Sequence, residues 1–304
     1  MRRHRLRWIA VMFVIAAGCG TASSTGGSTD PGGGDPSAFP VEVRGVTIPA
    51  LPQRIVSGSA THTEILFALG AGPNVIAVDD FSDFPAETAA LPHFDAFNPS
   101  VESIAAMNPD LVVLAFDPGE IADGLAAVGV PTIVFDAPAT LEDAYRQFEE
   151  VGSATGFADE AADLARRTRD DIAKAVTDIP QTARPSTYYH ELDATFFTIG
   201  SDTFLGSIYG LLGMVSIADE AGGGYPQLSA EFIVSADPDY IFLGDADCCG
   251  ETPETVGARP GWRELRAVTE GSVIAVDEAL SSRWGPRLTD LVEFLVDAVY
   301  GGGA

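Results

Sequence analysis

Aromatic and charged side chains recur along the chain, just after the short apolar strands that the sequence predicts. In α/β folds, ligands bind outside the carboxyl ends of the strands, where these residues would lie. Aromatic rings favour non-covalent binding of a broad, flat ligand, because stacking buries area at little cost in side-chain entropy. We predict a ligand-binding site that consists of Phe81, Phe84, Phe97, Phe116, Glu191, Phe196, Tyr225, Asp245, Arg283 and Trp284.

Arg283 is the strongest polar candidate of this set. Its guanidinium could hold a carboxylate, a phosphate or an anionic iron chelate, or pair with an acidic side chain of the cleft. Arg287, which enters the last predicted helix, is expected to have a structural role. Any single aromatic residue could equally belong to the core. Their recurrence after several separate strands favours the site.

The sequence contains no pattern typical of a catalytic centre. It lacks a Gly-x-Ser-x-Gly turn, a Walker-type phosphate loop and a Gly-x-Gly-x-x-Gly turn. His190, Glu191 and Asp193 lie close together, but alternation along a strand directs neighbours to opposite faces. We therefore predict a protein that is not an enzyme, with no catalytic residues and no cofactor.

Metal-ligand spacing is also missing. Beyond the N-terminal segment the histidines are His62, His93 and His190, and no His-x-His or Cys-x-x-Cys pair is present. A dedicated zinc or manganese site is therefore not expected, and we predict no metal ligands. Haem bound through an axial His or Tyr stays open.

Cys248 and Cys249 are adjacent and follow a strand predicted to end at Gly244, so they could face the cleft. Neighbouring Cα atoms lie about 3.8 Å apart, below the usual disulfide range of about 4.4–6.8 Å. An oxidising compartment nevertheless favours a bond between them over two free thiols. We predict a vicinal disulfide, with the two free thiols as the alternative.

Charge and length restrict the class of protein further. The chain has 304 residues and a formal net charge of -27. Such a field repels phosphate backbones, and no basic cluster follows the N-terminal segment, so nucleic-acid binding is not expected. The length exceeds that of a typical domain of about 100–150 residues, which fits two domains or one bilobal unit.

The N-terminus reads as an export signal. An arginine-rich start precedes an apolar run, Trp8–Ala17, that is too short to span a bilayer, and small residues then precede Cys19. This arrangement resembles the lipobox of bacterial lipoproteins, in which the cysteine is acylated. We predict a signal peptide at 1–18, lipidation at Cys19 and a flexible tether over 19–44. An ordinary secretory signal with an incidental cysteine is the alternative.

Residues 100–114 and 229–243 read as two copies of one segment. Aligned without a gap, they share Ser, Glu, Ile, Pro, Asp and Leu at equivalent places. Each copy predicts a polar-capped helical turn, a Pro-Asp break and an apolar strand. The spacing is too wide for a solenoid, whose units recur every ~20–50 residues. We therefore predict two lobes of similar build with a ligand cleft between them.

Strands that alternate with helices predict an α/β fold with mainly parallel central sheets. Thr140 and Asp143 form a variant capping box for a helix that runs to about Val151. A second helix, 158–177, has a narrow apolar stripe and is expected to join the lobes, although it could instead pack on one lobe. The predicted boundaries are 45–139 for the N-terminal lobe, 140–180 for the helical segment and 181–301 for the C-terminal lobe.

Several motifs occur in the order of a known family. They are TEILFALG at 63–70, DFSDFP at 80–85, NPDLV at 108–112, PGW at 260–262 and RWGPRL at 283–288. With them the chain resembles the solute-binding lipoproteins of ABC importers for iron-siderophores, haem and cobalamin, over almost all of the mature sequence. The resemblance implies the class III periplasmic-binding-protein fold, in which one long α-helix joins two similar lobes.

The resemblance also implies a docking surface. In that family one glutamate at the outer tip of each lobe meets arginines of the permease, and Glu102 and Glu231 occupy the matching motifs. A carboxylate at the same place in both lobes suits a two-fold partner with two basic pockets. The alternative is a pair of solvated carboxylates that the helix N-termini stabilise.

We therefore predict a monomeric receptor, lipid-anchored on the extracytoplasmic face of the bacterial membrane. It would capture a large metal chelate, a corrinoid such as cobalamin or a ferric siderophore, and deliver it to an ABC permease dimer with its cytoplasmic ATPase. The aromatic content of the cleft favours the corrinoid. A haem receptor, a chelatase-like enzyme on the same fold and a ligand-sensing surface lipoprotein remain alternatives.

Overall fold

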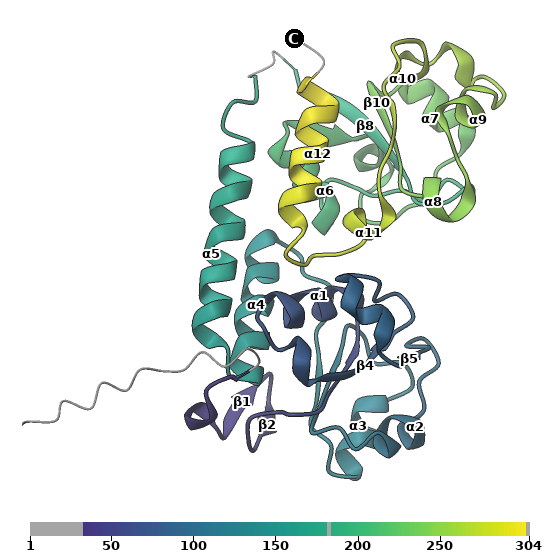
Figure 1. The fold of residues 1–304 in the computed structure, drawn as a ribbon. Coiled ribbons are helices and arrows are strands. Elements are labelled where there is room, and N and C mark those ends of the chain that lie inside the picture. Colours follow the sequence, from purple (N-terminus) through teal and green to yellow (C-terminus); the bar gives the residue numbers. More distant parts are fainter. Residues whose placement is uncertain (1–32, 181–183, 302–304) are drawn as a thin grey trace, which may run out of the picture. The chain divides into compact units, whose positions relative to one another are not determined.

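The computed structural model describes residues 33–180 and 184–301 (Figure 1). These residues belong to one compact α/β unit with two separate parallel sheets, as predicted. The predicted signal peptide, the lipidation site Cys19 and most of the tether lie outside the described residues. Within the described ranges no helix is both long and apolar enough to cross a membrane.

The first sheet has five strands in the order β5-β4-β3-β6-β7, all parallel. The central strands β3 and β6 are buried at every residue, because helices cover both faces of the sheet. Strands and helices of this lobe are β3 (Ile55–Gly58), α1 (Ala60–Ala68), β4 (Val75–Asp79), β5 (His93–Phe94), α2 (Val101–Ala106), β6 (Leu111–Leu114), α3 (Ile121–Ala127) and β7 (Thr132–Val134), with short 3-10 turns at Gly72–Asn74 and Ala86–Ala90.

The second sheet has four parallel strands in the order β11-β10-β8-β9. Its elements are β8 (Ser186–Glu191), α6 (Phe204–Leu211), β9 (Met214–Ser216), α7 (Ala230–Ala236), β10 (Tyr240–Leu243), α8 (Ala246–Cys249), α9 (Pro253–Gly257), α10 (Arg266–Thr269), β11 (Val273–Ala275), α11 (Glu278–Ser281) and α12 (Leu288–Tyr300), with 3-10 turns at Ile217–Ala221 and Trp262–Glu264. The fully buried Trp262 packs with Tyr189 and Phe196 beside this sheet.

Two long helices lie between the sheets in the sequence, α4 (Leu141–Thr155) and α5 (Ala158–Ala175). The predicted capping box is present, since Thr140 Oγ1 accepts from Asp143 N at 3.2 Å and the Asp143 carboxylate accepts from Thr140 N at 3.1 Å. Helix α5 packs along α4 and also along α12, the last helix of the chain (Figure 1). One long helix therefore joins the two lobes, as predicted.

The duplicated segments begin alike. Ser100 caps α2 by accepting from Ser103 N at 3.2 Å, and Ser229 caps α7 by accepting from Phe232 N at 3.1 Å. Each helix is followed by a non-glycine residue with positive φ, Asn108 at 51° and Asp237 at 45°. Both precede the proline of the repeat, so the same backbone break turns the chain into the following strand.

The aspartate of each copy fastens the segment to the neighbouring strand. Asp110 accepts hydrogen bonds from the backbone of Gln53 and Arg54, just before β3. Asp239 accepts one from Thr187 N at 2.8 Å, in β8. In both lobes the repeat strand pairs with that neighbour, β6 with β3 and β10 with β8. The duplication is thus structural as well as sequential.

The antiparallel hairpin of β1 (Val41–Val43) and β2 (Val46–Ile48), after a 3-10 turn at Pro36–Ala38, was not predicted. Its turn is formed by Arg44 and Gly45, both at positive φ, and Val43 and Ile48 are buried. The predicted boundary between tether and N-terminal lobe falls inside this hairpin. The remaining lobe boundaries stay predictions.

Candidate ligand-binding site

A pocket of about 610 Å³ lies where the loops after β3, β4, β6, β10 and β11 meet. The carboxyl ends of both sheets supply it, which is where parallel α/β folds bind ligands. Its volume lies within the roughly 300–1,000 Å³ that is usual for small-molecule sites. Of the predicted site residues, the structure brings Phe81, Phe116, Arg283 and Trp284 to its wall.

Three aromatic rings form a cluster at the first lobe's side of the pocket. The ring centroid of Phe97 lies 5.5 Å from that of Phe81 and 5.3 Å from that of Phe116. The side chains are 58%, 54% and 38% exposed for Phe97, Phe81 and Phe116, so they are not core residues. An exposed aromatic cluster at the rim of a pocket provides a stacking surface for a ligand.

Trp284 also lines this pocket. Its indole Nε1 donates to Gln147 Oε1 at 2.8 Å, which ties the ring to α4. The buried His62 faces the indole edge-on, with ring centroids 6.3 Å apart. The ring is therefore held in place before any ligand arrives.

Arg283 reaches the pocket but directs its charge at the protein. Its Nη1 donates to Glu64 Oε1 at 2.8 Å and to Asp83 Oδ1 at 2.7 Å. Its Nη2 donates to the carbonyl oxygen of Phe81 at 2.9 Å. The loop between α11 and α12 thereby holds the first lobe, and the guanidinium pairs with acidic side chains in the cleft.

Glu64 is the centre of this contact and was not predicted. Its side chain is only 1% exposed, and it also accepts from Arg287, at 2.6 Å and 3.1 Å. Arg287 thus has the structural role expected of it. A single glutamate in an otherwise apolar helix, TEILFALG, was the available signal, because a buried carboxylate needs a positive partner.

Six predicted site residues are not part of the pocket wall. Phe97 joins it through the aromatic cluster, and the other five lie away from it for different reasons. Phe84 lies beneath Arg287, whose guanidinium carbon is 4.5 Å from the ring centroid. Phe196 stacks on Trp262 in the second core, and Tyr225 is 62% exposed on a glycine-rich loop. Glu191 and Asp245 are fully buried at the ends of β8 and β10.

The burial of Glu191 and Asp245 creates a charged network under the second sheet. Arg259 binds Glu191 with both Nη atoms, each at 2.6 Å. Within the described residues neither carboxylate oxygen of Asp245 has a hydrogen-bond partner. Burial, with the neighbouring Glu191 charge as the second cause, raises the pKa of Asp245 to about 7.

This shift predicts a pH-dependent stability. Since the folded pKa of Asp245 lies above the unfolded value of about 3.9, the native state binds more protons than the unfolded state between about pH 4 and pH 7. The free energy of unfolding should fall as the pH rises through this window. We expect Asp245→Asn to remove that loss, on the order of 1–3 kcal/mol by pH 7.5.

Urea unfolding of the parent and the variant at about pH 4.5 and pH 7.5 measures this effect. Asp123→Asn, at an exposed position of α3, is the matched control and should behave alike at both values. A stability change for Asp245→Asn that is the same at both pH values would contradict the prediction.

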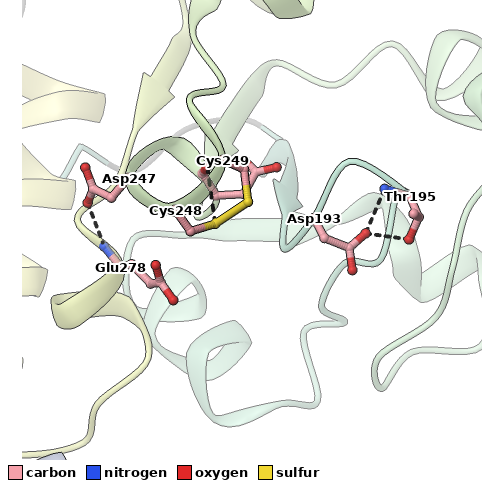
Figure 2. Close-up of a disulfide and its surroundings, with 7 residues drawn as sticks. Asp193, Thr195, Asp247, Cys248, Cys249 and Glu278 are labelled. Carbon is pink, nitrogen blue, oxygen red and sulfur yellow. Dashed lines mark hydrogen bonds between the residues drawn. A yellow bond between two sulfur atoms is a disulfide. The ribbon is translucent and has the colours of Figure 1, made fainter. Parts of the chain in front are cut away.

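Cys248 and Cys249 are joined by a disulfide in α8, with their Cα atoms 3.8 Å apart (Figure 2). Cys248 lines the pocket, and the neighbouring Asp247 carboxylate accepts from Glu278 N at 3.4 Å. The disulfide therefore lies on the second lobe's side of the cleft, beside the junction of α8 and α11.

A family model described as periplasmic binding protein matches residues 55–280, most of the chain. The chain belongs to the periplasmic binding protein family. This binding protein also has the fold of the solved members: it superposes on the periplasmic heme-binding protein RhuT from Roseiflexus sp. RS-1 with a TM-score of 0.74. That match is 27% identical and covers 82% of this chain and 98% of RhuT.

Two relatives are similar in sequence as well. The uncharacterized ABC transporter substrate-binding lipoprotein YvrC of Bacillus subtilis strain 168 is 28% identical, over 99% of this chain and 98% of YvrC. A cobalamin-binding protein of Halobacterium salinarum is 27% identical, over 84% of this chain and 71% of the relative. Together they place the binding protein among the substrate-binding proteins of ABC transporters.

The two predicted docking glutamates are exposed in the first turns of α2 and α7. Ser100 Oγ donates to Glu102 Oε2 at 3.0 Å, and the pKa of Glu102 is lowered by a backbone N–H and then by this hydroxyl. Neither Glu102 nor Glu231 forms an ion pair with any described residue. Both carboxylates are therefore accessible to a partner.

None of the described histidines is part of the pocket wall. His62 and His190 are buried, and burial is the main cause that lowers their pKa values to about 3 and about 4. His190 hydrogen-bonds Tyr209, and His62 bonds Ser59 and Gln147. Across residues 33–180 and 184–301, no group of three or more His, Cys, Asp or Glu could hold a metal ion.

Proposed function

We propose that this protein is the substrate-binding component of an ABC importer and that its ligand is a corrinoid. The observation that carries the proposal is the pocket at the carboxyl ends of both sheets, whose wall includes Phe81, Phe116 and Trp284 and is extended by the ring of Phe97. A corrin ring is broad and flat, and such rings gain most from aromatic contacts. The cobalamin-binding relative supports the same ligand class.

The side chains of the wall also favour a ligand whose metal ion is already fully coordinated. The described wall includes no His, Tyr or Met, and Cys248 is engaged in the disulfide. Haem-binding proteins hold the iron through an axial His, Tyr, Cys or Met. A corrinoid arrives with its cobalt already coordinated, so the wall needs only to enclose it.

The remaining parts of the proposal concern location and delivery. The export signal and Cys19 support a lipid-anchored receptor on the extracytoplasmic face, tethered by the residues before the β1–β2 hairpin. The accessible Glu102 and Glu231 support docking to a two-fold permease, which would take the ligand onward with its ATPase. Binding itself requires no covalent step.

A spectroscopic titration tests the ligand. We expect cyanocobalamin to bind with one-to-one saturation and to quench the fluorescence of Trp284. Phe116→Ala should weaken binding roughly tenfold, because one ring contact is worth about 1–1.5 kcal/mol.

Phe84→Ala is the matched control, since that ring is exposed outside the pocket and should leave the affinity close to that of the parent. Tight binding of haem or of a ferric chelate, with no binding of cobalamin, would refute the corrinoid proposal and identify that ligand class instead.

A further inference from the structure

The wall of the pocket contains many acidic residues and few basic ones. Its described wall includes Arg283 as the basic residue. The acidic residues of the wall are Asp79, Asp80, Asp83, Asp247, Asp277 and Glu278. A ligand therefore enters a cavity of predominantly negative charge.

The single arginine does not offset these carboxylates for a ligand. Its guanidinium is shared between Glu64 and Asp83 and is capped by the carbonyl of Phe81. Glu64 itself lies behind the wall. Arg283 is thus neutralised by the protein, and a ligand anion would find no free guanidinium there.

Four carboxylates of the wall form no ion pair with a described residue, although the charge of Arg287 also acts on Asp277: Asp80, Asp247, Asp277 and Glu278. Asp247 accepts from Glu278 N at 3.4 Å and Asp277 from Leu280 N at 3.0 Å. These backbone contacts fix the positions of the two carboxylates without removing their charge.

These four residues come from both lobes. Asp80 follows β4 in the first lobe, whereas Asp247 lies in α8 and Asp277 and Glu278 begin α11 in the second. Like charges on two walls repel across the cavity, and low-dielectric walls concentrate the field between them. A positive ligand between the walls relieves this repulsion, whereas a negative one adds to it.

We infer that the pocket selects chelates with a net positive charge over neutral or anionic chelates of the same shape. This inference rests on the proposed corrinoid function and specifies its substrate class. It disfavours ferric chelates with a negative charge and rings that carry free carboxylates. Aromatic contacts provide the affinity for the ring. The carboxylates make that affinity higher for positively charged chelates than for neutral or anionic ones.

Cobalamins with different axial ligands provide the probe, because ring and nucleotide stay constant. Aquacobalamin carries one positive charge, cyanocobalamin is neutral and sulfitocobalamin carries one negative charge. Titrations of the purified full chain at about pH 6 keep the axial water protonated. The described wall has no imidazole or free thiol that would displace that water.

We expect Kd to rise about fivefold at each step from aquacobalamin to cyanocobalamin to sulfitocobalamin at low salt. Added salt should narrow this ordering, because exposed charges are screened. The variant Asp80→Asn, Asp277→Asn, Glu278→Gln should bring the three values to within about twofold of each other. Asparagine at 277 retains the capping acceptor for Leu280.

A charge-matched control separates the pocket from the acidity of the whole chain. Glu42→Gln, Asp123→Asn, Glu220→Gln removes the same number of charges at exposed positions away from the wall and should keep the ordering. Loss of the ordering in this control, or its survival in the pocket variant, would overturn the inference.

The ligand series separates the two proposals. Equal affinity for the three cobalamins in the parent chain would overturn charge selection and leave the corrinoid function standing. Failure of all three to bind would overturn the corrinoid function, and charge selection with it.

Discussion

Uptake of the ligand is expected to stop when Glu102 and Glu231 are both replaced by arginine, while the affinity of the isolated protein for its ligand stays unchanged. Both carboxylates are exposed, lie in the first turn of a short helix and form no ion pair with a described residue. Arginine would bring like charges into two basic pockets of a permease, and like-charge contact suppresses association strongly. Uptake of labelled cobalamin by cells, together with a titration of the purified variant, measures both quantities.

The repeat makes the design of this experiment symmetric. Glu102→Arg and Glu231→Arg alone should each reduce uptake, because each removes one of two equivalent contacts. Glu42→Arg with Glu220→Arg provides a control of equal charge change at other exposed positions. Uptake at the parental rate by the Glu102/Glu231 double variant would refute permease docking through these tips.

Glu64→Gln is expected to lower the free energy of unfolding by about 3–5 kcal/mol. The substitution leaves Arg287 without its acidic partner and Arg283 with Asp83 alone. Both arginine side chains are largely buried, at 10% and 20% exposure, so water cannot take the place of the lost carboxylate. Urea unfolding followed by circular dichroism gives the value.

Glu42→Gln on β1 is the control for this measurement, since Glu42 is exposed and has no ion-pair partner among the described residues. It should change stability by less than about 0.5 kcal/mol. A comparable loss in both variants would show that the cluster around Glu64 contributes little.

Local patterns of the sequence predicted the fold well. The capping box at Thr140 and the stripe of α5 are read from neighbouring residues, and both are present. The serines and aspartates of the repeat occupy equivalent places in two lobes. The β1–β2 hairpin was missed because its strands are only three residues long and give too few alternations to detect.

The candidate site was harder to predict, because a strand end gives the position of a loop and not the direction of its side chains. Phe81 reaches the pocket, whereas Phe84, three residues later, lies under Arg287. Glu191 is drawn inward by Arg259, a partner 68 residues away with no local signal. Asp80, Asp247, Asp277 and Glu278 also follow predicted strands, but their residue type alone did not distinguish them from ordinary surface carboxylates.

The long helix α5, which contacts both α4 and α12, has a kinetic consequence. A rigid helix that joins the lobes allows the two sheets only small relative motions. The pocket between them must therefore already be open to the ligand in the empty protein. We therefore expect capture to proceed at a diffusion-controlled rate without a slow gating step. Release of the ligand is then expected to be the slow step.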